Sequence, residues 1–288
     1  PDSEAMKHKF EEIVGFPVNY ELISCAPWRQ NLLLADRYRD GRVFLAGDSV
    51  HLVIPTGGLG MNTGVGDAFD LAWKLIGTLK GWGGPELLDS YEIERRQVGE
   101  RNVGASRYAN IGRQQWRSIA TQDIFSGTPH GEASKQALIQ VADSEQRKGN
   151  RMIGAELGYR YVDSPCIDNI PGGPEHRVGE YHPNVWPGSR LPHCWLDDGK
   201  ALQDLLPETY ILLILGDKSL DTSKLRQSYE AIGAPVTELR IESNRIRDLY
   251  GFNFLVLRPD MHVVWRGADV PQNPKEIASI STGHGRLD

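Results

Sequence analysis

The sequence predicts a mixed α/β protein, in which a helix-rich part with a few strands precedes a smaller α/β domain. Apolar residues between Gly60 and Lys80 recur at three- and four-residue spacing, which is the spacing of one helix face. Proline and glycine are concentrated over residues 165–192, as is typical of a domain boundary. Beyond this stretch, short apolar runs alternate with helical patterns.

The N-terminal part predicts a helix and then strands. Residues 7–13 have the pattern of a helix interior, which leads us to expect that the chain is a fragment of a longer protein. Apolar runs at 18–23, 32–34 and 42–46 predict strands, with a turn at residues 38–41 before the last of them.

An amphipathic helix is expected over residues 60–80, with Phe69 and Trp73 in the core. It should end at the glycines of residues 81–84. Pro85 suits the first turn of a second helix, which should continue past Arg101.

On this second helix, the sequence Glu94-Arg95-Arg96 is expected to be a solvent-exposed face, with Glu92 paired to Arg96 four residues later. The following residues, 121–165, are polar and predict a connector with one helix over residues 132–147.

The C-terminal residues predict, in order, a strand at 210–215, a helix at 223–232, a strand at 236–241, a short helix at 245–250, two strands at 252–257 and 262–266, and a helix near Pro274. This is the order of a thioredoxin-like α/β domain. The domain has no Cys-x-x-Cys sequence and therefore no dithiol chemistry, and we expect the solitary Cys194 to be a buried structural residue.

Composition excludes several classes of protein. With 32 Lys and Arg against 38 Asp and Glu, the net charge of −6 argues against a dedicated nucleic-acid binder. No apolar run approaches the ~20 residues of a membrane helix. Cys25, Cys166 and Cys194 are too far apart for a disulfide framework or a metal site, and with no apolar signal region we expect a cytoplasmic protein.

The segment from Arg42 to Asn62 carries the chemistry. A buried strand is expected to end at Asp48, a long glycine-rich loop follows, and a helix begins near Met61. Ligands bind at the carboxyl ends of strands in α/β proteins, and the start of a helix offers unpaired N–H groups to an anion or an electron-rich ring edge. The loop is not a dinucleotide fingerprint, because Gly-x-Gly-x-x-Gly occurs nowhere in the chain.

Residues 42–102 resemble the second flavin-binding segment of the group A FAD-dependent aromatic monooxygenases, the family of phenol hydroxylase and para-hydroxybenzoate hydroxylase. The likeness continues through Leu88-Asp89-Ser90-Tyr91-Glu92 and Glu94-Arg95-Arg96. The tail is similar to the C-terminal domain of the phenol hydroxylase branch in Leu191-Pro192-His193, Trp195-Leu196-Asp197-Asp198-Gly199 and Leu257-Arg258-Pro259-Asp260.

The resemblance implies four parts: residues 1–41 end a substrate-binding domain, 42–120 complete an FAD-binding domain, 121–165 form a helical connector, and 166–288 form the thioredoxin-like domain. It implies FAD as cofactor, NADH or NADPH as reductant, and molecular oxygen and a small phenolic or related aromatic compound as substrates. A homodimer is compatible with it, and nucleic acid and membrane are not among the implied partners.

Carried over by position, the resemblance implies that Asp48 hydrogen-bonds the ribityl and pyrophosphate region of FAD. Pro55 would lie over the flavin ring and exclude water from it. The residues that would line the pyrimidine edge of the ring are Leu59, Gly60, Met61 and Asn62, and Gly58 would also contact the ring. The negative charge that this edge gains on reduction would be stabilised by the helix N-terminus.

No catalytic acid or base for the substrate can be named. The lone His51 is more often a cap or core residue than a catalyst. Gly-x-Gly-x-x-Gly is not found in these residues, and the Asp-Gly motif midway in the family's complete enzymes is expected to lie outside them. Ser49-Val50 and Ile54 depart from the residues usual at their positions.

We therefore expect the isolated chain to be inactive or barely active, with apolar surface exposed around residues 18–47. Two alternatives stay open at this point: a non-catalytic binding or assembly module, and one chain of a split flavoenzyme.

Overall fold

The computed structural model describes residues 2–287 and divides the chain into two units, one before Leu32 and one from Leu32 onward. In the first unit, α1 (Ser3–Val14) starts after Asp2, whose side chain accepts a hydrogen bond from the Glu4 N–H, and ends at Gly15 in the left-handed conformation. The pattern of residues 7–13 thus belongs to a capped helix.

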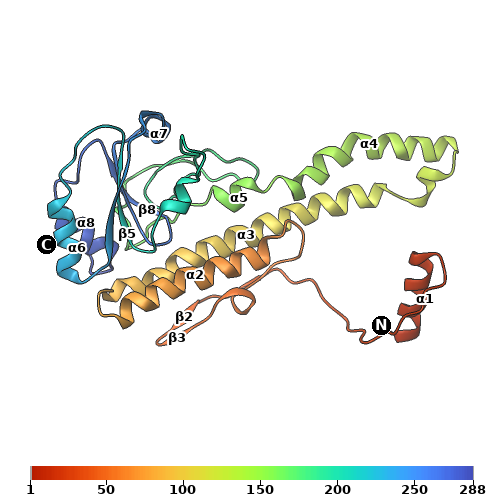
Figure 1. The fold of residues 1–288 in the computed structure, drawn as a ribbon. Helices are drawn as coiled ribbons and strands as arrows, with labels where there is room; N and C mark the ends of the chain where they lie inside the picture. The colour runs from red at the N-terminus through yellow and green to blue at the C-terminus, as the bar shows by residue number, and fades with distance from the viewer. Residues whose placement is uncertain (1, 288) are drawn as a thin grey trace. The chain divides into compact units, whose positions relative to one another are not determined.

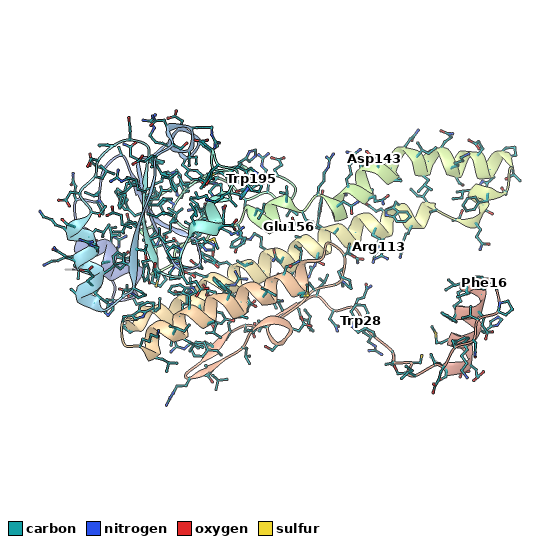
Figure 2. The ribbon with its side chains drawn as sticks, viewed as in Figure 1. Phe16, Trp28, Arg113, Asp143, Glu156 and Trp195 are labelled. Carbon is teal, nitrogen blue, oxygen red and sulfur yellow. The ribbon has the colours of Figure 1, made fainter. Side chains whose placement is uncertain are left out.

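The strand predicted at residues 18–23 is wrong. These residues are extended but pair with no other strand of the described chain. A strand requires a hydrogen-bonded neighbour, and an apolar run alone does not supply one. Large side chains of this first unit are open to solvent, with Phe16 and Trp28 exposed by 67% and 65% (Figure 2).

The second unit opens with two small two-stranded sheets. In the first, β1 (Leu33–Leu34) pairs antiparallel with β4 (His51–Leu52). In the second, β2 (Arg39–Asp40) pairs antiparallel with β3 (Val43–Phe44). The strand before Asp48 is therefore only two residues long, and the expectation that it is buried is wrong, because Val43 is 63% exposed.

Helices make up most of the following residues. The long ones are α2 (Leu59–Leu79), α3 (Pro85–Ile119) and α4 (Pro129–Asn150), and α5 (Ile153–Leu157) is short. As Figure 1 shows, α2 runs alongside the first part of α3, and α4 returns along its end. The three predicted helices are confirmed, and none of those formed by residues 2–287 has the length and apolarity needed to cross a membrane.

The C-terminal elements match their predicted order closely. The sheet has the order β6-β5-β7-β8, in which β6 is parallel and β7 antiparallel to β5, and β8 is antiparallel to β7. Its strands are β5 (Tyr210–Leu215), β6 (Val236–Ile241), β7 (Phe254–Leu257) and β8 (Val263–Gly267). Its helices are α6 (Ser223–Ile232), α7 (Asn244–Tyr250) and α8 (Pro274–Ser281). The mixed α/β fold class is confirmed.

Both faces of this sheet are covered. Alternate residues of β5 point to opposite faces, so Leu212 packs with α6 and α8 while Leu213 packs with α7. The first of these cores also takes in Trp73, Trp82 and Leu87 from α2, α3 and the turn between them. The C-terminal domain thus shares a core with the helix pair.

A close backbone contact between Gly84 and Gly283 also holds the C-terminal domain against the helix pair. The Gly84 N–H donates to the Thr282 carbonyl at 2.8 Å, and the Glu86 N–H donates to the Gly283 carbonyl at 2.9 Å. A Cβ on Gly84 would lie 2.2 Å from the Gly283 oxygen, so the approach requires glycine at this position.

Helix α2 has an unusual distribution of side chains: its polar face is buried and its apolar face is exposed. Asp67, Asp70 and Lys74 are each at most 2% exposed. The opposite face carries an exposed apolar stripe of Met61, Val65, Phe69, Ile76 and Leu79. The prediction that Trp73 is a core residue is confirmed, but the same prediction for Phe69, which is 50% exposed, is wrong.

The apolar stripe should make the isolated chain associate with itself, because contiguous exposed apolar surface favours contact with other apolar surface. We expect the double substitution Phe69→Lys and Leu79→Lys to lower the weight-average mass seen in sedimentation velocity. The matched control is Ile139→Lys and Ile153→Lys, two exposed residues outside the stripe. Equal association of both variants would contradict this prediction.

Candidate functional site

The glycine-rich loop, residues 47–62, begins in a short 3₁₀ turn, Gly47–Ser49, and ends in the first turn of α2. Gly47 has a φ of +62°, which favours glycine. The Asp48 side chain is exposed and forms no hydrogen bond within residues 2–287. Its carboxylate is therefore free to accept hydrogen bonds from a ligand.

The start of α2 is open. Gly58 precedes the helix in the left-handed conformation, with φ +66°, and provides no side-chain cap. Asn62 donates from Nδ2 to the Gly58 carbonyl at 2.8 Å, which closes the loop onto the first turn. The first-turn N–H groups of α2 have no acceptor among the described residues. Such an end fits an anion or an electron-rich edge.

The predicted site residues differ in what they can offer. Met61 and Asn62 are exposed, as are Pro55 and Gly58. Leu59 is only 3% exposed and packs with Met152, so only its backbone can contact a ligand. All of these residues lie on one continuous loop and helix start.

Three buried side chains, which we call the loop anchor, hold the beginning of this loop: His51, Asp67 and Arg95. The Asp67 carboxylate accepts from the Gly47 N–H at 3.0 Å, from His51 Nε2 at 2.9 Å and from Arg95 Nε at 2.8 Å. Burial raises the pKa of Asp67, but the hydrogen bonds from His51 and the charge of Arg95 outweigh it, so the pKa lies below its usual value. His51 is thus a structural residue of the core.

The far half of the loop is held by α3. Ser106 Oγ lies 3.0 Å from the Ile54 carbonyl oxygen and 3.2 Å from that of Thr56. A close approach completes the support, since a Cβ on Gly60 would lie 2.8 Å from Val53 Cγ2. The loop is therefore fixed at both ends before any ligand binds.

A second buried group, the charge cluster, lies farther along the same helices and consists of Asp70, Lys74, Glu94, Arg258 and Asp260. Lys74 Nζ lies 2.7 Å from both Asp70 and Glu94. Arg258, at the end of β7, places Nη2 3.0 Å from Glu94 and Nε 3.0 Å from Asp260. The cluster joins α2, α3 and the C-terminal domain.

Three carboxyl groups share two cations in the charge cluster, and the pKa values of Asp70 and Glu94 are shifted in opposite directions. Burial raises the pKa of Asp70 to about 6, because Lys74 offsets burial only in part and Glu94 raises the pKa further. Burial also opposes ionisation of Glu94, but Arg258 and Lys74 outweigh it and lower the pKa to about 2. Glu94 is thus the ionised centre of the cluster.

The charge cluster and the loop anchor overturn the expectation that Glu94-Arg95-Arg96 is a solvent-exposed face. Glu94 and Arg95 are at most 2% exposed. Glu92 is not paired with Arg96, because its carboxylate accepts from the backbone N–H of Arg39 at 2.9 Å. Charged residues on a helix are buried when distant segments supply their partners, and local spacing does not show this.

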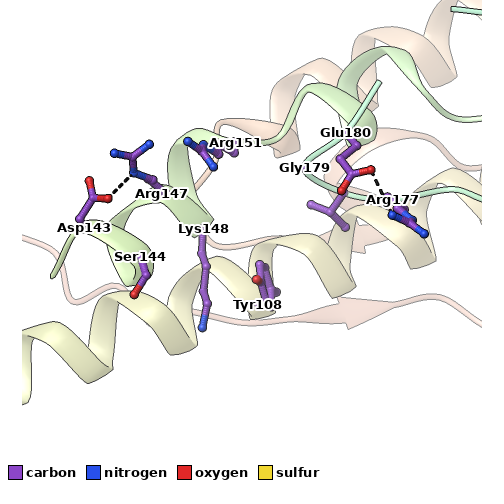
Figure 3. A pocket seen from close by; sticks show the side chains of 10 residues that line it. Tyr108, Asp143, Ser144, Arg147, Lys148, Arg151, Arg177, Gly179 and Glu180 are labelled. Atoms are coloured by element: carbon purple, nitrogen blue, oxygen red, sulfur yellow. Dashed lines mark hydrogen bonds and ion pairs between the residues drawn. The ribbon is translucent and has the colours of Figure 1, made fainter. Parts of the chain in front are cut away.

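The cavities do not replace the loop as the site. One of about 730 Å³ lies between α3, α4 and residues 177–180 (Figure 3). Its charged side chains are largely paired with each other, Arg147 with Asp143 at 2.7 Å and Arg177 with Glu180 at 3.2 Å. Another cavity, of about 340 Å³, lies between the first turns of α2, helix α3 and the end of α5. Its lining includes Thr63, Asn102 and Tyr159.

Sequence reasoning did not identify Asp67, Arg95 and Ser106 as supports of the loop. A signal was present for the first of them: Asp67, Asp70 and Lys74 lie at spacings of three and four and so share one helix face. A polar helix face is ordinarily solvated, so this spacing alone does not predict burial.

Models of two protein families match this chain. The model of an FAD binding domain matches residues 2–106, and the model of the aromatic-ring hydroxylase C-terminal domain matches residues 184–282. The chain belongs to the FAD-dependent aromatic-ring hydroxylases. The resemblance found from its motifs is thereby confirmed.

Individual relatives of this chain include a putative polyketide hydroxylase of Streptomyces coelicolor, 46% identical over 336 residues, with 92% of this chain and 53% of the relative covered. The FAD-dependent monooxygenase apdD of Emericella nidulans is 32% identical, with 99% of this chain and 49% of the relative covered. The chain spans about half the length of the curated relatives that it matches.

Solved structures are similar over nearly the whole chain. The native and K252c-bound structure of RebC-10x superposes with a TM-score of 0.86 at 30% identity, covering 98% of this chain and 53% of that one. The flavin-dependent monooxygenase PieE, in complex with FAD and substrate, gives a TM-score of 0.78 at 28% identity, covering 98% and 55%.

Proposed function

We propose that the protein carrying this chain is an FAD-dependent monooxygenase, which uses NADH or NADPH and molecular oxygen to hydroxylate a phenolic or related aromatic ring. The observation that carries the proposal is the uncapped start of α2 behind a glycine-rich loop anchored at both ends. Among relatives of this chain are a phenol 2-monooxygenase of Pseudomonas and a 2,4-dichlorophenol 6-monooxygenase of Cupriavidus pinatubonensis, which supports an aromatic substrate.

In this proposal the loop binds the flavin. In the ribityl and pyrophosphate region, Asp48 would accept hydrogen bonds from the ribityl hydroxyl groups, for which its exposed carboxylate is suited. The backbone N–H groups of the first turn of α2 would bind the pyrimidine edge, and Pro55 and Gly58 would contact the ring. When bound, FAD supplies the redox and oxygen chemistry.

The chain's own residues then contribute position and electrostatics. The partial positive charge of the α2 N-terminus favours the ring edge that becomes negative on reduction. Asp67 keeps the loop in place through Gly47, so the site is formed in advance of the ligand. The division of the chain at residues 41, 120 and 165 into substrate, FAD, connector and thioredoxin-like parts is proposed along with this function.

Further polypeptide is required to complete such a site. In the proposal, the exposed apolar stripe of α2 is covered by an ADP-binding part, supplied either by the same polypeptide or by a separate chain. A split flavoenzyme is a second candidate, because the stripe lies on α2, the helix that begins at the end of the glycine-rich loop, and a separate chain could cover it.

The test is the intact mass and absorption spectrum of the natural protein. Bands near ~370 and ~450 nm, followed by NADH or NADPH oxidation that a phenol stimulates, are the expected result. A natural protein without flavin, which takes up none when FAD is added, would overturn the proposal in favour of a binding module. Mixing with a candidate ADP-binding chain before gel filtration distinguishes the split enzyme.

A pair of glycine substitutions tests the role of the loop. A methyl group on Gly60 would meet Val53 Cγ2 at 2.8 Å, so Gly60→Ala should displace the loop and weaken FAD binding by about tenfold or more. Gly104 of α3 has open space at its Cβ position, so Gly104→Ala should leave FAD affinity unchanged. Fluorescence titration with FAD measures both, and equal affinities would contradict the prediction.

A further inference from the structure

Two adjacent residues of α3 serve two different networks. Glu94 belongs to the charge cluster and contacts the C-terminal domain through Arg258. Its neighbour Arg95 belongs to the loop anchor and holds Asp67, which in turn holds the Gly47 N–H. Because Glu94 and Arg95 share a peptide bond, a rotation or shift of α3 moves both networks together.

Helix α2 repeats this arrangement. Asp67 of the loop anchor and Lys74 of the charge cluster are seven residues apart, two helical turns on the same buried face. The two helices are therefore cross-linked at two levels, by Arg95 with Asp67 and by Glu94 with Lys74. The second level is the one that the C-terminal domain reaches.

A second path joins the C-terminal domain to the loop anchor. Asp260 lies 3.1 Å from Nδ1 of His262, and the His262 ring stacks on Tyr161 with 4.3 Å between ring centroids. Arg95 Nη1 donates to the Tyr161 hydroxyl at 3.1 Å. Both paths start in the residues 258–262 that follow β7, and both end at Arg95 or its neighbour.

Stability alone does not account for five buried charges. Removing charges from water is costly, and apolar residues of similar volume often replace a buried ion pair at no loss of stability. A buried ion pair can also specify one register, because a shift that separates the partners leaves an uncompensated buried charge. Arg258 forms a fork with Glu94 on one side and Asp260 on the other, which fixes the orientation of α3.

We propose that Glu94 and Arg258 are positioning residues, through which the C-terminal domain sets the orientation of α3 and thereby the glycine-rich loop. The thioredoxin-like domain then supports the loop through α3, because the Arg258 side chain bonds to Glu94 and Asp260, which lie outside the loop. The consequence for FAD binding rests on the proposed function, whereas the coupling itself does not.

Hydrogen exchange of the 288-residue chain, followed by mass spectrometry, tests the coupling without any cofactor. In Arg258→Met, amides of residues 45–58 should exchange faster by roughly tenfold beyond any change in strand β5, whose amides report global unfolding. The matched control is Arg245→Met, which removes an exposed ion pair with Asp197 in the same domain. It should leave the loop unchanged.

A second variant distinguishes loss of the coupling from misfolding of Arg258→Met. Glu94→Gln keeps the shape of the side chain, removes its charge, and should also accelerate exchange in the loop. If in both variants the loop and β5 accelerate equally, or the loop is unchanged, the proposal is overturned. A wild-type protein that binds no FAD would overturn the proposed function instead, and the exchange comparison would still decide the coupling.

Discussion

Replacement of Asp67 by alanine is expected to lower the free energy of unfolding of the chain by about 3–5 kcal/mol. The substitution leaves the Arg95 guanidinium, 2% exposed, without its carboxylate, and leaves the N–H groups of Gly47 and His51 without an acceptor. An unpaired buried charge accounts for most of the expected loss. Urea denaturation, followed by tryptophan fluorescence, measures it.

Two variants separate the causes. Asp67→Asn keeps one acceptor oxygen for Arg95 but turns an N–H donor toward Gly47 or His51, so its loss of stability should be intermediate. Asp36→Asn, at an exposed carboxylate, should change the free energy of unfolding by less than about 0.5 kcal/mol. A loss below about 1 kcal/mol for Asp67→Ala would contradict the assignment of Asp67 as the support of the loop.

The second large effect concerns pH. Because the fold raises the pKa of Asp70 from 3.8 to about 6, the folded chain binds a proton at this carboxyl more tightly than the unfolded chain does. The stability that this proton contributes is fully present below pH 3.8 and is lost as the pH rises through about 6. The loss amounts to about 3 kcal/mol at most, since one pKa unit corresponds to about 1.4 kcal/mol.

Asp70→Asn removes this pH-dependent contribution to stability, because the amide is neutral at every pH. As the pH rises from about 4 to about 7, we expect the free energy of unfolding of the wild type to fall relative to that of Asp70→Asn. Asp143→Asn, at an exposed pair with Arg147, serves as the control and should show no such shift. A difference that stays constant over this range would show that Asp70 is ionised throughout.

Glu94 should behave oppositely. Its pKa is lowered to about 2, so its contribution to stability is present above its usual pKa of 4.5 and is lost only as the pH falls toward 2. The charge cluster therefore keeps its link to Arg258 over the whole range in which Asp70 titrates.

Local patterns in the sequence determined much of the fold. The continuous apolar run of β5 and the helical patterns of α6 and α7 predicted these elements to within a residue, since each depends on its own side chains and neighbours. The glycine-rich loop was located in the same way, because positive φ and an uncapped helix start leave direct traces in the residue types.

Only the tertiary structure decided which face of α2 is buried. An apolar helix face normally packs inward, and the sequence gives no reason to reverse this for Phe69 and Asp67. The reversal depends on Arg95, 28 residues after Asp67, and on Arg258, 164 residues after Glu94. A buried charge is stable only beside its partner, and partners that far apart in the chain meet only once the helices and the C-terminal domain have packed.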